Sequence, residues 1–245
     1  MEWYPTPSYL VKKRVILDYL NNIPFKDFLE VGCGAGDLLA ALNSRGYQGM
    51  GIDISAEAVA AAKKRLRGGK INIEQKKVED LEAAFDLVIA SEVLEHCPDD
   101  VGLLRDLRAR MRPGGSLLIT VPAHMGKWGA NDNFSGHLRR YEREELRQMI
   151  ERADLELLFI HSYGVPVYNM MKPFYDRAIR KRLVPTDSMA ERTAKSSGMW
   201  LFTGNKGIFS ILFNDFTMYP FYLIQKLFFN TDLGNGYFAV AKKRL

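Results

Sequence analysis

Two short stretches of the chain carry residues whose types and spacing suit chemistry. In residues 28–39, FLEVGCGAGDLL, three glycines recur at every second position after an apolar run that contains Glu30. In residues 91–96, SEVLEH, two glutamates and a histidine follow another apolar run. A glycine turn lets bare backbone approach a ligand closely, and carboxylates beside an imidazole can move protons or bind a metal ion. Both stretches are therefore candidate functional sites.

The glycine turn restricts the kind of ligand that can bind. A dinucleotide-binding turn requires G-x-G-x-x-G, which would place its third glycine at position 37, but position 37 is Asp. A carboxylate at this helix N-terminus would repel the pyrophosphate that such a turn binds. A cofactor that carries phosphate groups is therefore disfavoured.

The elements that must position these residues alternate between strand and helix. An amphipathic helix is expected at residues 8–21, and further along Ser55 is the expected N-cap of another helix. The alternation predicts a parallel sheet with helices on both faces. The expected strands are DFLEV, QGMGID, INIEQ, FDLVIA, SLLITV, LELLFIHSY and GYFAVAKK, and the later helices are expected at residues 37–46, 55–67, 100–111 and 142–153.

The pattern E-x-G-x-G-x-G resembles the first motif of the class I S-adenosylmethionine-dependent methyltransferases. The resemblance continues in order through GMGIDIS, VED at 78–80, FDLVIASEVLEH and RPGGSLLITVP, and it covers roughly residues 25–160. It implies a Rossmann-like, seven-stranded, mostly parallel sheet with an antiparallel last strand, and S-adenosyl-L-methionine as the cofactor. The cofactor-binding residues that it implies are Glu30, Gly32, Cys33, Gly34, Gly36, Asp53, Ile54, Val78, Glu79 and Ser91.

By the same resemblance, Asp53 accepts hydrogen bonds from both ribose hydroxyls, which suits the two oxygens of a carboxylate. Ile54 would form an apolar wall for the adenine ring. A purely structural role remains open for several of these residues. The glycines could simply form a turn, Asp53 could cap the following helix, and Val78 and Glu79 could make no contact. Glu30 at a buried strand end is costly unless it is hydrogen-bonded, and the amino group of the cofactor would offset that cost.

The SEVLEH stretch is similar to the ubiquinone-pathway O-methyltransferases and to the small-RNA 2′-O-methyltransferases. In the latter, two glutamates, a histidine and a later histidine hold Mg²⁺, which implies Glu92, Glu95, His96 and His137 as metal ligands here. The i, i+3, i+4 spacing would let one helical turn direct the first three inward. Two other interpretations remain open: a packed histidine without metal, or a metal-free site with His96 or His137 as the general base. Candidate catalytic residues are His96, His137 and Glu92; His124 is a weaker candidate, and His161 is expected in the core.

The stretch NFSGHLRRYEREEL, residues 133–146, follows the fifth expected strand and resembles the substrate-side segment of quinone- and glycan-directed methyltransferases. Arg139, Arg140 and Tyr141 could hold an acidic substrate. Equally, Tyr141 could pack at the start of the next helix while both arginines stay in solvent. The sequence does not separate these two interpretations.

We expect three parts in the chain: an N-terminal helix at residues 1–22, a methyltransferase core at 23–164 and 235–245, and a helical, aromatic cap at 165–234. About 70 residues between the last two strands exceed an ordinary connection. The aromatic residues 199–229 are interrupted by glycine and proline, which argues against a spanning helix. ERTAKSSG before them is an expected hinge, and the nearby basic residues would suit anionic lipid headgroups: Lys172, Arg177, Arg180, Lys181 and Arg182.

The composition of the chain limits the classes of function that it can have. Hydrophobic residues make up 47% and charged residues 26%, as in ordinary soluble enzymes. The net charge of +5 is dispersed, so nucleic-acid binding is not expected. Two distant cysteines and the absence of a signal-peptide pattern favour the cytoplasm, with peripheral membrane contact through the cap as an option. The oligomeric state is not indicated.

The expected function is O-methylation of a small, glycan or lipid-like acceptor, because SEVL differs from the D/N-P-P-Y tetrapeptide of many nitrogen-directed enzymes. Two alternatives remain. One is a membrane- or partner-docked module with the same fold. The other is a metal-assisted RNA ribose methyltransferase, against which the apolar cap argues.

Overall fold

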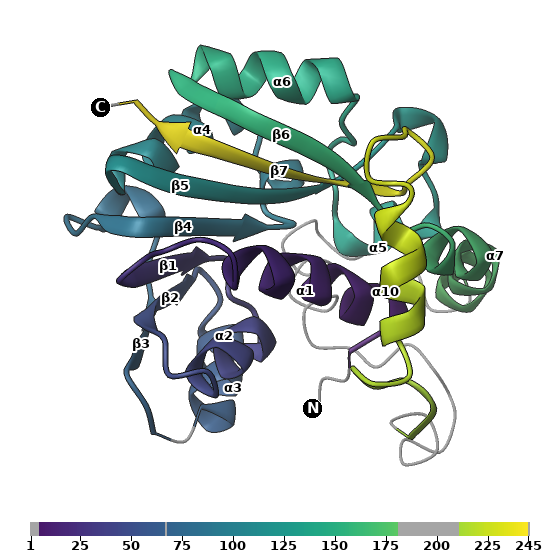
Figure 1. The fold of residues 1–245 in the computed structure, drawn as a ribbon, viewed down its shortest axis with the longest axis horizontal. Coiled ribbons are helices and arrows are strands. Elements are labelled where there is room, and N and C mark those ends of the chain that lie inside the picture. Colours follow the sequence, from purple (N-terminus) through teal and green to yellow (C-terminus); the bar gives the residue numbers. More distant parts are fainter. Residues whose placement is uncertain (1–4, 67, 181–210, 245) are drawn as a thin grey trace.

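The computed structural model describes residues 5–66, 68–180 and 211–244. Its centre is a seven-stranded sheet in the order β3-β2-β1-β4-β5-β7-β6 (Figure 1). All neighbouring strands run parallel except at β7, which lies antiparallel between β5 and β6. The strands are β1 (Asp27–Val31), β2 (Gln48–Asp53), β3 (Ile71–Gln75), β4 (Phe85–Ser91), β5 (Met111–Pro122), β6 (Leu155–Tyr163) and β7 (Gly236–Lys243). The predicted fold class is confirmed.

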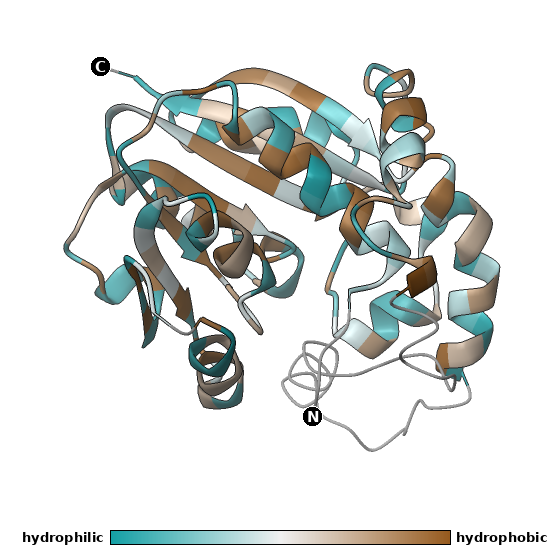
Figure 2. Cartoon of the chain, turned by 60° about the horizontal axis from the view of Figure 1, so that its bottom comes forward, coloured by the Kyte–Doolittle hydropathy of each residue, from teal (hydrophilic) through white to brown (hydrophobic). Residues whose placement is uncertain are grey.

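Helices cover both faces of this sheet (Figure 1). The core of one face includes α4 (Asp100–Ala109) and α6 (Arg143–Arg152), and the core of the other includes α1 (Pro7–Leu20), α2 (Asp37–Asn43) and α3 (Ala56–Arg65). The central strands are strongly hydrophobic (Figure 2), since their residues are buried from both sides. Strand order reverses between β1 and β4, and ligands of such sheets bind at this reversal, outside the carboxyl ends of the strands.

Local signals explain most helix starts. Thr6 caps α1 by accepting a hydrogen bond from the Tyr9 backbone, and Ser55 caps α3 through Ala58, as predicted. Several predicted boundaries are wrong. The helix expected at 55–67 ends at Arg65, and the strand expected from Ser116 begins at Met111. The helix expected at 37–46 ends at Asn43, before a short turn that reaches Gly46, and the helix expected at 100–111 ends at Ala109 because β5 already begins at Met111. The start of β5 pairs with Phe85 across an irregularity in the ladder.

The segment between β6 and β7 contains α7 (Val167–Arg180) and α10 (Tyr219–Lys226). Helix α10 packs against α1, where the Tyr222 hydroxyl donates to Asp18 and the Lys226 ammonium lies 3.2 Å from the same carboxylate. Helix α7 packs against α5 (Ala130–Ser135). The expected hinge, Lys181 and Arg182 lie outside the described residues. None of the helices in the described ranges has both the length and the hydropathy needed to cross a membrane.

Candidate functional site

The glycine turn joins β1 to α2 at the reversal of strand order. All three glycines have positive φ, from +52° to +73°, in the left-handed region that favours glycine. A Cβ at Gly36 would lie 2.8 Å from the Cβ of Ala62 in α3, whereas the space beside Gly34 is open. The turn therefore packs closely on one side and leaves backbone accessible on the other.

A cavity of about 340 Å³ lies over this turn. Its walls come from α1, the turn, the end of β4, α5 and the residues after it, and the junctions of the cap with the core. Of the predicted site residues, those that line it are Glu30, Gly32, Cys33, Gly34, Ser91, Glu92, His96 and His137. Gly36, Asp53, Ile54, Val78, Glu79 and Glu95 do not line it.

The predicted adenosine contacts lie beside the turn, at the ends of β2 and β3. Asp53 accepts from the Gly34 backbone at 2.8 Å and from the Ser55 backbone at 2.9 Å. Ile54 is 72% exposed, an unusual position for a large apolar side chain. Val78 packs its side chain into the core, which leaves only its backbone for a ligand, and Glu79 forms a surface ion pair with Lys77.

Glu30 has the electrostatic character of a binding residue. Its side chain is buried at the end of β1, and its Oε2 has no hydrogen-bond partner among the described residues. Burial, with the nearby charges of Asp37 and Asp53, raises the pKa of Glu30 well above its usual value, and Lys12 opposes this shift. A carboxylate oxygen left unpaired beside a cavity favours a ligand that donates hydrogen bonds.

Glu92 occupies a strained position directly after β4. Its φ of +58° is in the left-handed region, which costs free energy in a residue with a Cβ. Its Oε1 accepts from the Tyr163 hydroxyl at 2.6 Å and from Thr120 at 3.2 Å, and lies 3.7 Å from the Lys12 ammonium. Burial opposes ionisation, but Lys12 and the bond from Tyr163 keep the pKa of Glu92 below its usual value.

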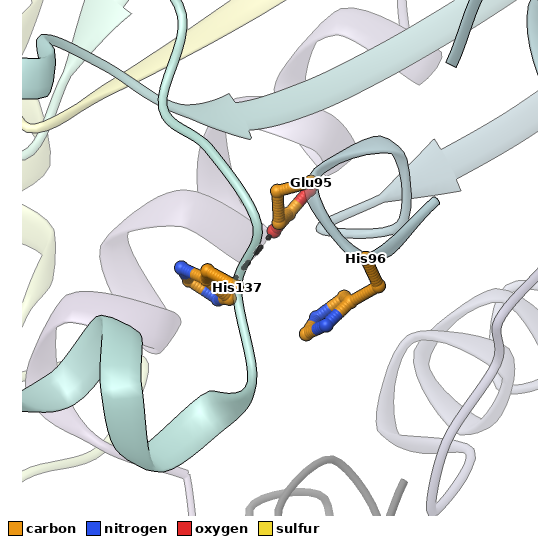
Figure 3. Close-up of side chains that lie close together, drawn as sticks. All are labelled: Glu95, His96 and His137. Carbon is orange, nitrogen blue, oxygen red and sulfur yellow. Dashed lines mark ion pairs between the residues drawn. The ribbon is translucent and has the colours of Figure 1, made fainter. Parts of the chain in front are cut away.

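The predicted single helical turn that directs Glu92, Glu95 and His96 inward is wrong. Only Leu94–His96 forms a short 3₁₀ helix, and Glu92 precedes it in a left-handed conformation. The Glu92 side chain therefore separates from those of Glu95 and His96. Glu95 and His96 instead meet His137, with one ligand atom from each lying within 4.8 Å of the others (Figure 3). Glu92 is not part of this group.

In this Glu95–His96–His137 group, Glu95 is fully buried and His96 is half-buried, and the electrostatics are unusual. Neither carboxylate oxygen of Glu95 has a hydrogen-bond partner within the described part of the chain, and Oε1 lies 3.8 Å from Nε2 of His137. Burial and the charge of Glu92 raise the pKa of Glu95 well above its usual value. Burial, with the charge of His137, lowers the pKa of His96 to about 4. His96 is therefore neutral at neutral pH, with a lone pair that suits a metal ion or a hydrogen-bond donor better than it suits proton abstraction.

Arg140 is not solvated, so the alternative that leaves both arginines in solvent is wrong for Arg140, whereas the Arg139 side chain is 33% exposed. Arg140 is buried against the cavity and is bonded to Asp132, Ala123 and Asn235. Arg139 pairs with Asp100 at 2.7 Å. The buried Tyr141 hydroxyl donates to that same carboxylate, as the packing interpretation requires.

Several lining residues were not identified from the sequence. They are Tyr9 and Lys12 on α1, Tyr163 at the end of β6, Tyr168 at the start of α7, and Asn235 before β7. Each of these residues lies near the edge of the sheet where ligands bind. That position was the only feature that could have identified them from the sequence. His124 pairs with Glu142 away from the cavity, and His161 stacks between Phe159 and Phe229 at a half-buried position.

In this sheet the antiparallel strand β7 is inserted between β5 and β6, and a glycine turn lies where the strand order reverses. Together these features define a class I S-adenosylmethionine-dependent methyltransferase. The sequence profile of a family described as a methyltransferase domain matches residues 9–159, and the chain belongs to this family. S-adenosyl-L-methionine is the methyl donor of the class.

Curated relatives and a solved structure agree with this family. A ubiquinone biosynthesis O-methyltransferase from Nitrosospira multiformis is 40% identical over 102 residues, which cover 39% of this chain and 43% of that protein. One from Idiomarina loihiensis is 28% identical over 67% of this chain and 74% of that protein. The magnesium protoporphyrin IX methyltransferase of Synechocystis PCC 6803, with bound SAH, has a TM-score of 0.56 at 16% identity, over 66% of this chain and 79% of that one. The first curated relatives are matched over less than half of their length.

Proposed function

We propose that the cavity binds the methionine end of S-adenosyl-L-methionine and that the chain O-methylates a small-molecule acceptor. The observation that carries this proposal is the buried Glu30 carboxylate beside the glycine turn, one oxygen of which has no partner in the described part of the chain. The cofactor's ammonium group would supply the missing donor. Lys12, which lines the cavity from α1, would bind the cofactor's carboxylate.

The adenosine part would extend from the turn toward the ends of β2 and β3. Each oxygen of Asp53 accepts one backbone hydrogen bond and keeps a lone pair for a ribose hydroxyl. The exposed Ile54 side chain would cover the adenine ring, and the backbone at Val78 and Glu79 would contact its edge. Gly32, Cys33, Gly34, Gly36 and Ser91 would complete the contact surface.

Methyl transfer requires an acceptor oxygen in line with the sulfonium and a group that receives its proton. His137 is the proposed general base, because its imidazole lines the cavity. The neutral His96 and the charged Glu92 would help to position the acceptor and stabilise its developing charge. As the acceptor oxygen forms its bond to the methyl carbon, the carbon–sulfur bond breaks, the proton passes to His137 and S-adenosylhomocysteine is released.

Glu95, His96 and His137 would hold a metal ion if the reaction uses one. The donor set fits, since the Glu95 carboxylate is buried without a described partner and both imidazoles lie close to it. Two imidazoles favour zinc or manganese over the Mg²⁺ implied by the resemblance. A bound ion would act as a Lewis acid on the acceptor hydroxyl. In that case His137 would be a metal ligand and not the general base, and exhaustive chelation would abolish activity until Mn²⁺ or Zn²⁺ is added. Unchanged activity rejects the metal and leaves the general-base scheme.

Titration calorimetry with S-adenosylmethionine tests the cofactor site. The wild-type chain and the Glu151→Ala control, an exposed acidic residue on α6, should bind, whereas Asp53→Ala should abolish binding. Wild-type affinity in Asp53→Ala would reject the site. A screen of quinols, sugars and lipid-linked glycans, read by S-adenosylhomocysteine release, then identifies the acceptor class.

A second candidate, membrane contact through the cap of a cytoplasmic protein, is favoured by exposed apolar side chains near α7 and α10. Phe216 is 87% and Leu227 79% exposed, and Met170 and Phe174 are also largely exposed. Flotation with anionic vesicles at low salt should recover the wild-type chain. A Phe216→Ser/Leu227→Ser variant should float less, and absence of wild-type flotation would reject the contact.

A further inference from the structure

Asp132 is a buried carboxylate that the methyl-transfer scheme does not yet use. It lies on α5, fully buried, and its Oδ1 is 2.9 Å from Nδ1 of His137. The same oxygen accepts from Nε of Arg140 at 2.8 Å, and Oδ2 accepts from the Gly129 backbone at 2.8 Å. The guanidinium of Arg140 forms a buried ion pair with this carboxylate, and donors therefore occupy both of its oxygens. Asp132 is therefore an ionised carboxylate, and it can only accept.

This arrangement determines which nitrogen of His137 carries the hydrogen. Because an ionised carboxylate has no proton to donate, the 2.9 Å contact requires a hydrogen on Nδ1. In the neutral ring the lone pair is then on Nε2. Nε2 is also the atom that lies 3.8 Å from Glu95, in the group shown in Figure 3. The reactive nitrogen of His137 therefore points toward the cluster instead of toward α5.

Asp132 is itself held in place by Arg140. Nη1 of this arginine donates to the Ala123 carbonyl at 2.8 Å, just after β5, and to Asn235 at 3.2 Å, just before β7. The carboxylate is thus tied to two neighbouring strands of the sheet. Such outer partners orient a functional imidazole and fix its tautomer.

We propose that Asp132, anchored by Arg140, is a positioning residue that keeps the lone pair of His137 on Nε2 for its role in the reaction. The proposal rests on the proposed role of His137 in methyl transfer. In the Arg140–Asp132–His137 series, Arg140 holds Asp132, and Asp132 keeps the His137 imidazole in one tautomer and one ring orientation. A merely structural salt bridge would stabilise α5 without affecting the chemical step.

The first test reads the tautomer directly. Histidine-¹⁵N-labelled wild-type protein is examined by NMR at a pH where the imidazoles are neutral, and the His137 signals are assigned with His137→Gln. We expect hydrogen on Nδ1 of His137 in the wild type and a shift toward the Nε2–H form in Asp132→Asn. An Nε2–H tautomer in the wild type overturns the proposal, even if the variant does not fold.

The second test separates positioning from stability. With an acceptor found in the screen, Asp132→Asn should lower kcat by at least about 10-fold, with unchanged KM for S-adenosylmethionine. The matched control is Glu142→Gln, which alters another histidine–carboxylate pair at 2.9 Å, with His124, outside the cavity. This control should keep the wild-type kcat.

The variant His137→Gln separates the positioning role of Asp132 from the base role of His137. If His137→Gln is inactive while Asp132→Asn keeps wild-type kcat, the positioning role is rejected and the proposed base remains. If His137→Gln is fully active, the proposed base is rejected, and the NMR result alone decides whether Asp132 sets the tautomer.

Discussion

At the scale of single residues, the site concentrates features that reduce stability. Glu30 and Glu95 are buried with carboxylate oxygens that no described residue pairs with, and Glu92 has a left-handed backbone. Each of these features is costly in a folded protein. All three residues lie at the carboxyl ends of β1 and β4 or just beyond them, where a ligand of this fold binds. Binding is the physical reason that best explains why such residues are kept there.

Replacement of Glu30 by Gln should stabilise the ligand-free protein and weaken the cofactor complex. The pKa of Glu30 is raised in the fold, so its contribution is favourable below the usual carboxyl pKa and is lost as pH rises through the folded-state pKa. At neutral pH, Glu30→Gln should gain about 1–2 kcal/mol in urea unfolding and should lower affinity for S-adenosylmethionine.

The control for this change is Glu57→Gln, at an exposed position on α3. It should leave both stability and affinity close to wild type. Equal cofactor affinity in Glu30→Gln and the wild type would contradict the assigned ammonium contact.

At the scale of elements, the glycine turn joins cofactor binding to helix packing. A methyl group at Gly36, with φ of +73°, would be strained and would meet Ala62 of α3. Gly36→Ala should therefore cost about 2–4 kcal/mol of unfolding free energy and should weaken cofactor binding, as measured by urea unfolding and calorimetry.

Gly46→Ala provides the matched comparison for this change. Its φ of +80° is similar, but nothing lies within 4 Å of the added carbon. It should cost only about 1 kcal/mol and leave affinity unchanged. Equal losses in both variants would show that backbone strain, and not contact with α3, dominates at Gly36.

The strands and the glycine turn were predictable because their signals are local. Apolar runs mark the buried strands, and the spacing of the glycines marks the turn. The geometry at Glu92 was not predictable, since the i, i+3, i+4 spacing assumes a right-handed helix and this residue has positive φ. The Asp132–Arg140 anchor depends on Asn235, 95 residues beyond Arg140. No local pattern reports such a contact.

At the scale of the whole molecule, the cavity exists only because distant segments close around it. Helix α1 forms one wall, and α10 holds α1 through Tyr222 and Lys226 at Asp18. Tyr168 of α7 and Asn235 before β7 complete the opposite side. Helices α1 and α7 therefore enclose the site together, although more than 140 residues separate them in the sequence.

Burial in this enclosure also predicts how the chelator-treated protein responds to acid. Because desolvation lowers the pKa of His96 to about 4, the unfolded chain binds a proton at higher pH than the folded one does. The stability contributed by His96 is then present above about pH 6.5 and is lost as pH falls toward 4, by about 3 kcal/mol in total. Urea unfolding at pH 7, 5.5 and 4.5 should show a smaller acid loss in His96→Gln than in wild type. The control His124→Gln, which changes a histidine outside the cavity, should show the same dependence of unfolding free energy on pH as wild type. If His96→Gln also showed that dependence, His96 would be hydrated and its enclosure open.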